Sequence, residues 1–162
     1  MIDLIIPAYN FNLFYAQRLL AEVPDAQLAA QPVPGRVMNH AAFILGHLAW
    51  ASDNGLTLLG QPHILPSDWQ DAYGRGVTPV EDRARYLDKA TLLKLLEETH
   101  TALSTTLMRA ANDIFKQPAP EQLQKWFPSL GHMLMGLMTT HEAHHLGQLS
   151  AWRRAMGWGQ VL

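Results

Sequence analysis

A histidine-rich stretch near the C-terminal end of the sequence has the spacing of a metal site. The stretch HEAHH, residues 141–145, matches the H-E-x-x-H pattern of zinc metalloproteases. Its flanks read TTHEAHHLGQLSAWRR and contain Gly147 as their one helix breaker, which favours a helix. On a helix, His141 and His145 lie one above the other because they are four residues apart. The pattern predicts a metal site and leaves the chemistry of the metal open.

The residues after this motif exclude a zinc protease. Such enzymes take a third ligand from a Glu on a later helix or from a His six residues after the second histidine. The tail after His145 reads LGQLSAWRRAMGWGQVL and contains no His, Asp or Glu. The sequence also offers no convincing strand against which a peptide substrate would lie. We therefore expect a third ligand from upstream.

Two upstream histidines are candidates for that ligand. His40 and His47 are seven residues apart and so lie on nearly the same face of a helix. His47 falls in the apolar run FILGHLAWA, where burying an imidazole is costly unless something binds it. Gly46 beside it would permit a close backbone approach. We predict His47 as the third ligand, with His40, expected at the rim of the bundle, in reserve.

Three histidines from two helices leave metal positions open for water or substrate, which is the catalytic rather than the closed structural pattern. An ion held in this way can lower the pKa of a bound water toward about 7. The same position could favour the thiolate form of a thiol. All-imidazole ligation suits Zn²⁺, Ni²⁺ or Fe²⁺ without choosing among them. We expect one divalent ion.

Three further polar residues are weaker catalytic candidates. Glu142 could act as a general base on bound water, although a surface or packing carboxylate is the favoured interpretation. Gln148 and Asn54 point closer to the ligand direction and could orient a ligand imidazole or bound water. Hydrogen bonding between helices is an equally good explanation for both.

Four long amphipathic segments must position these residues. Apolar periodicity predicts helices over about residues 5–23, 37–59, 89–111 and 130–156. Residues 60–88 form a connection rich in Gly and Pro, with one helical turn expected from Ser67 to Tyr73. We therefore predict an all-α four-helix bundle that forms a single domain over residues 1–162. Several side chains of the connection could either cover the site or pin the connection to the bundle: Trp69, Tyr73, Arg75 and Tyr86.

Composition narrows the range of partners. The 162 residues are 48% hydrophobic and 16% charged, as in a globular chain, and the net charge is −2. Without a basic run, no nucleic-acid partner is expected. The sequence has no Cys, which excludes disulfides, thiolate ligands and a cysteine nucleophile. The start, MIDLIIPAYN, lacks a basic signal region, and no apolar run approaches membrane-spanning length, so we expect a cytoplasmic protein with no membrane contact.

Longer motifs over nearly the whole chain resemble the DinB-like (DinB/YfiT) superfamily. They are PGRVMNHAAFILGHLAW, LGQP followed by LPSDW, and HEAHHLGQLSAWRRAMG. The H-x-x-H-H-x-G-Q-L pattern is specific for that family. The resemblance implies a four-helix bundle in up-down-down-up order, with a long crossover between the second and third helices. It also implies a metal triad of His47, His141 and His145, and a homodimer.

Where an activity is known in that family, the relatives include thiol-dependent enzymes, and many other members have no assigned reaction. Relatives include bacillithiol S-transferases and a mycothiol-dependent maleylpyruvate isomerase. The resemblance implies a metal-dependent enzyme that activates a thiol cosubstrate or water, as a thiol S-transferase or hydrolase of a small molecule. The alternatives are a non-catalytic, dimerising stress-related metal protein and a metal-free bundle with buried histidines. Relatives often have Arg where this chain has Leu146, so any role of that Arg in binding an anionic substrate does not carry over.

Overall fold

The computed structural model describes residues 2–161, which form helices and loops without a β-strand. Three long α-helices are α1 (Ile2–Leu20), α2 (Ala41–Leu58) and α4 (Lys89–Arg109). The fourth long segment consists of α5 (Leu130–Gly136), a π-helical turn (Leu137–His141) and α6 (Glu142–Ala155). The predicted all-α class is confirmed.

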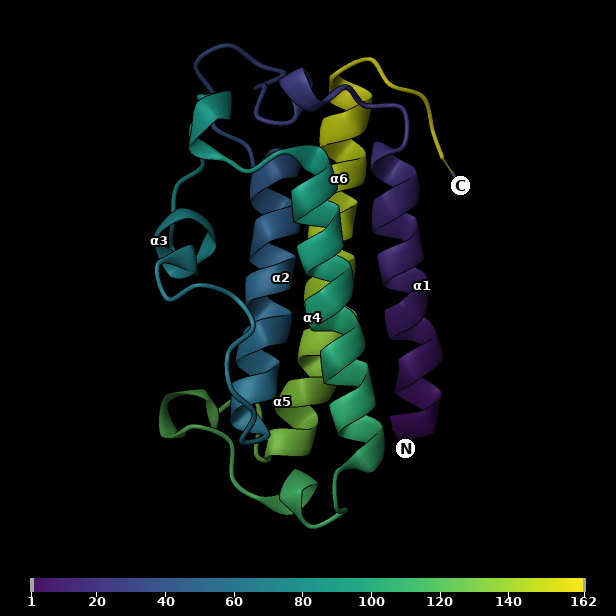
Figure 1. Cartoon of the computed structure of the whole chain (residues 1–162), viewed down its shortest axis with the longest axis vertical. Coiled ribbons are helices and arrows are strands. Elements are labelled where there is room, and N and C mark those ends of the chain that lie inside the picture. Colours follow the sequence, from purple (N-terminus) through teal and green to yellow (C-terminus); the bar gives the residue numbers. More distant parts are fainter. Residues whose placement is uncertain (1, 162) are drawn as a thin grey trace.

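The four long segments pack as a ring. Helix α1 packs against α4 and α6, and α2 packs against the same two helices on the other side. Figure 1 shows that α1 and the α5–α6 segment run in one direction, whereas α2 and α4 both begin at the opposite end. The crossover, residues 59–88, therefore returns along the side of the bundle between the end of α2 and the start of α4.

Short helical turns interrupt the loops. The crossover contains α3 (Trp69–Tyr73), where one turn was expected from Ser67 to Tyr73, and a 3₁₀ turn at Arg83–Arg85. Another 3₁₀ turn, Asp25–Gln27, follows α1. Two more, Ile114–Lys116 and Glu121–Leu123, lie between α4 and α5. Among the described residues, no helix is both long and apolar enough to cross a membrane.

Helix ends show where local chemistry overrides apolar periodicity. Helix α4 begins at Lys89 as predicted, because the Asp88 carboxylate accepts a hydrogen bond from the Thr91 amide. Helix α2 begins at residue 41 rather than 37, because His40 is extended and its Nδ1 accepts from the Phe43 amide at 3.3 Å. Helix α1 spans residues 2–20 rather than 5–23. The helix predicted over 130–156 is helical from Leu130 to Ala155, but the π-helical turn, which was not expected, adds one residue per turn before α6.

The interior has two apolar clusters with buried polar side chains between them. One cluster includes Ile44 and Trp152, and the other includes Leu103 and Met138, all fully buried. Between the clusters, α2, α4 and α6 each carry polar side chains that are less than 10% exposed. This polar layer consists of Ser52, Asp53, Thr99, His100, Glu142 and His145. Because buried polar groups need partners, the layer is the natural place to look for a functional site.

Candidate metal centre

The structure brings together the three histidines that the sequence singled out. His47 lies in the middle of α2, His141 ends the π-helical turn and His145 lies in the first turn of α6. One ring nitrogen of each lies within 4.8 Å of the other two. The ring centroid of His145 is 4.6 Å from those of both other histidines. Among the described residues, these three form the group of side chains that could hold a metal ion.

The spacing of the ring nitrogens fits a single small ion. The Nε2 atoms of His47 and His141 are 3.3 Å apart. Two nitrogens bound to one tetrahedral Zn²⁺ at its usual bond length would be separated by about 3.3 Å. The pair is therefore already at the separation that shared ligation requires.

The hydrogen bond to His47 fixes the position of its ring proton. Its Nδ1 lies 2.7 Å from the main-chain oxygen of Tyr73. Because a carbonyl oxygen only accepts, Nδ1 carries the hydrogen in this contact. The neutral ring then has its lone pair on Nε2, the atom that faces His141. This is the form in which an imidazole binds a metal.

His145 is held in the same way by a side chain. Its Nδ1 lies 3.0 Å from Oε1 of Gln148, which also accepts from the Asn39 amide at 3.0 Å. The amide nitrogen of Gln148 donates to Nε2 of His144 at 2.9 Å. With Gln148 so placed, His145 donates from Nδ1 and keeps the lone pair of Nε2 for the triad. Gln148 makes both contacts expected of it, since its side-chain oxygen holds the His145 ring and also accepts a hydrogen bond from Asn39, which lies just before α2.

Burial keeps the triad uncharged at neutral pH. Loss of solvent lowers the pKa of all three imidazoles, and neighbouring histidines lower the values of His141 and His145 further. The pKa falls from 6.5 to about 4 for His141 and to about 3 for His145. Nδ1 of His141 is buried without a hydrogen-bond partner in the part of the chain that is described. Three neutral imidazoles, each of which has one unprotonated ring nitrogen, are a donor set suited to Zn²⁺, Ni²⁺ or Fe²⁺.

The other catalytic candidates lie in different surroundings. Glu142 is 3% exposed and belongs to the polar layer, where its Oε2 is 3.6 Å from Nε2 of His100. Burial raises its pKa. Of the two roles expected for Glu142, this position matches a packing carboxylate. Asn54 donates to the main-chain oxygen of Trp50 on its own helix at 2.8 Å.

The reserve ligand His40 has a structural role. It is fully buried, so the expected position at the rim is wrong. Its Nδ1 caps α2, and its Nε2 donates to the main-chain oxygen of Val80 in the crossover at 3.0 Å. Both ring nitrogens are engaged, which leaves no lone pair for a metal. The seven-residue spacing correctly suggested that His40 and His47 lie on one face. Their hydrogen-bond partners show that His40 caps α2 whereas His47 belongs to the triad.

Sequence reasoning missed two groups that hold the site. Asn39 contacts Gln148 from just before α2, and the Tyr73 carbonyl reaches His47 from α3. The signal for the second was Gly46, whose missing side chain suggested a close backbone approach. The residue type of Asn39 could not indicate its role, because Asn39 contacts the side-chain amide of Gln148 rather than a histidine of the triad.

The fold and the site together define a class of protein. It is an all-α bundle in which three neutral histidines from two helical segments could hold a metal ion. A family model places the chain more closely. The model of the DinB superfamily matches residues 15–149, a range that includes all three histidines. The chain belongs to the DinB superfamily. A comparison with curated proteins finds no match.

Proposed function

We propose that this protein is a metal-dependent enzyme that activates a thiol cosubstrate or water, as a thiol S-transferase or hydrolase of a small molecule. The observation that carries the proposal is the convergence of three neutral imidazoles, two of them with Nδ1 engaged and Nε2 available. Three protein ligands are the number found in catalytic sites, which keep a position open.

The residues of the site divide the work between them. A divalent ion bound there supplies a Lewis acid that favours the deprotonated form of a thiol or water. His47, His141 and His145 would hold it, and Gln148 keeps the ring of His145 in orientation. Phe43 and Trp50 stack on the His47 ring with centroids 5.6 and 5.4 Å away. These aromatic rings exclude water from the ligand and strengthen electrostatic interactions beside it.

Metal analysis tests the site itself. Purified protein should hold about one divalent ion per chain, and the same analysis identifies the ion. The double variant His47→Ala/His145→Ala should lose it. His132→Ala removes a histidine of α5 that contacts Ser129 instead, and should retain it. Equal metal content in the double variant and the wild type would reject the triad as the binding site.

Turnover tests the enzymatic part of the proposal. Monochlorobimane, offered with a panel of low-molecular-weight thiols, should be consumed by the metal-loaded protein. Simple esters and amides test the hydrolase form. The double variant serves as the matched control in each assay. Consumption at the same rate by wild type and double variant, or by neither, would contradict an activity at this site.

A second candidate is a non-catalytic, dimerising metal protein of the stress response. The observation in its favour is an exposed apolar face on α1, where Leu4 is 77%, Phe11 52% and Phe14 48% exposed. A homodimer would cover such a face. This candidate retains metal and forms a dimer but turns over no substrate. Both candidates share a cytoplasmic location and the up-down-down-up order, which the helix directions in Figure 1 support.

A further inference from the structure

Helix α3 of the crossover lies directly against α2 at His47. The indole nitrogen of Trp69 donates to the main-chain oxygen of Gly46 at 2.9 Å. The next residue of α2, His47, donates from Nδ1 to the main-chain oxygen of Tyr73. Trp69 and Tyr73 are 6% and 3% exposed and stack with centroids 4.6 Å apart. Two buried hydrogen bonds to consecutive residues thus hold α3 beside the triad.

Gly46 makes this approach possible. A Cβ atom built on Gly46 would overlap the ring of Tyr73. The ring therefore occupies the space that any other residue at position 46 would need. Without that space, the Tyr73 carbonyl could not lie within hydrogen-bond distance of His47.

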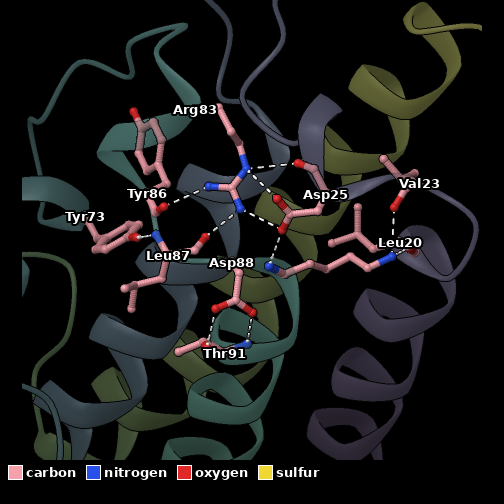
Figure 2. A network of polar contacts seen from close by, with 10 residues as sticks. Leu20, Val23, Asp25, Tyr73, Arg83, Tyr86, Leu87, Asp88 and Thr91 are labelled. Atoms are coloured by element: carbon pink, nitrogen blue, oxygen red, sulfur yellow. Dashed lines mark hydrogen bonds and ion pairs between the residues drawn. The ribbon is translucent and has the colours of Figure 1, made fainter.

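The far end of the crossover is anchored to two other parts of the bundle. The Tyr73 hydroxyl accepts from the Leu87 amide at 3.3 Å. Arg83 donates to the main-chain oxygens of Tyr86 and Leu87 at 2.8 and 2.9 Å. It also reaches the Asp25 carboxylate at 2.7 Å, beyond the end of α1. Figure 2 shows these contacts as one connected network.

Asp25 extends the network to the start of α4. Its carboxylate also accepts from the Lys89 amide at 2.6 Å. The ammonium group of Lys89 donates to the main-chain oxygens of Leu20 and Val23, where α1 ends (Figure 2). The hydrogen bond from Arg83 lowers the pKa of Asp25, so the carboxylate stays charged. A continuous set of contacts therefore runs from the end of α1 to the ring of His47.

We propose that α3 is a structural part of the metal centre, in which the Tyr73 carbonyl is the positioning group that keeps the His47 proton on Nδ1. Displacing α3 should then loosen a bound ion although every ligand is present. This inference rests on the proposed metal site. The loss of such an outer partner of a ligand weakens metal binding by about 10- to 100-fold.

A pair of identical substitutions tests the inference. Gly46→Ala should displace α3 and weaken binding of Co²⁺ or Zn²⁺ by about 10- to 100-fold, measured by competition with a chromophoric chelator. Gly147→Ala is the matched control, because nothing lies within 4 Å of the added methyl on the helix that carries His145. It should bind as the wild type does. Equal affinity in both variants would overturn the proposal.

The ring tautomer gives a second readout that needs no metal. In the metal-free wild type and in Gly147→Ala, long-range ¹H–¹⁵N spectra should show His47 protonated on Nδ1. In Gly46→Ala the proton should move to Nε2, the position preferred by a free imidazole. A wild type with this tautomer that binds no metal would reject the proposed function and leave the positioning role supported. A wild type with the proton on Nε2 would reject the positioning role, whatever its metal content.

Trp69→Phe provides a milder variant if Gly46→Ala does not fold. It keeps an aromatic ring beside Tyr73 but removes the indole N–H that donates a hydrogen bond to the Gly46 main-chain oxygen. Since a neutral hydrogen bond contributes up to about one order of magnitude to an equilibrium, metal affinity should fall by up to about tenfold. Its His47 signal should show a mixture of tautomers. A wild-type tautomer together with wild-type affinity in this variant would contradict a role for α3.

Discussion

The buried histidines should make the metal-free protein sensitive to mild acid. In the folded state the pKa of His145 is about 3 and that of His141 about 4, against an ordinary value of 6.5 when the chain unfolds. Below pH 6.5 the unfolded chain therefore binds protons that the folded chain does not. The contribution of these histidines to the free energy of unfolding is therefore fully present above pH 6.5. It decreases as the pH falls toward their pKa values in the folded protein. The relevant window runs from pH 6.5 down to about 4 for His141 and to about 3 for His145.

The loss of stability at pH 5 depends little on the exact pKa of the two histidines in the folded protein. Both histidines stay neutral in the folded protein at that pH, so each contribution is set by the 1.5 pH units between 5 and the unfolded value of 6.5. At about 1.36 kcal/mol per unit, each histidine removes about 2 kcal/mol of stability. Total stabilities of domains are about 5–15 kcal/mol, so the loss is easily measured.

Urea unfolding of wild type and His145→Gln between pH 8 and pH 5 tests this expectation. The variant lacks one of these titrating groups, so its stability should fall by about 2 kcal/mol less than that of the wild type. Glu142, whose raised pKa acts in the opposite direction, is present in both proteins and cancels.

Ile44→Val is the control for a change in packing alone. Ile44 is fully buried on the helix that carries His47, and the substitution should lower stability by about 0.5–1.5 kcal/mol at every pH. A constant difference between wild type and His145→Gln across the whole pH range would refute the reasoning, because it would mean that His145 titrates alike in both states.

Further consequences concern the site, a helix cap and the exposed face. Gln148→Ala should weaken metal binding by about 10- to 100-fold in a chelator competition, whereas Gln148→Glu, which keeps an acceptor for His145, should not; equal effects would exclude orientation as its role. Asp88→Ala should cost about 1 kcal/mol in urea unfolding through loss of the cap on α4, and an unchanged midpoint would contradict that. In the second candidate function the wild type is a dimer in sedimentation velocity and Phe11→Ser/Phe14→Ser is a monomer; a monomeric wild type would reject the proposed dimer, and a dimer that survives the substitutions would place the interface elsewhere.

Much of the fold was predictable because its signals are local. The start of α4 was placed correctly from Asp88, a common cap, but the start of α2 was not, because histidine is a rare one. The π-helical turn at Leu137–His141 had no signal of its own, since its residues are compatible with an α-helix. The spacing of apolar residues does not distinguish a single π turn from an α turn. Which of the two forms depends on how the segment packs against the neighbouring helices.

The site was predictable to the extent that it depends on residue type. His141 and His145 could be placed from their spacing, and His47 from the apolar residues around it. The roles of His40 and Glu142 could not be settled in this way, because they depend on what lies opposite them on other helices. Gly46 indicated that some group approaches α2 closely, but the sequence could not identify it as the Tyr73 carbonyl, since every residue has a carbonyl and only the path of the crossover brings this one to His47.

The separation of the triad along the chain has a consequence for how the protein matures. His47 and His141 are 94 positions apart. During synthesis, the emerging chain carries a single histidine of the triad until the segment containing α6 has been made. The proposed ion therefore enters only after translation has passed this point and the bundle has closed. It must come from the exchangeable metal of the compartment in which folding finishes, so the availability of metals there contributes to which one is acquired.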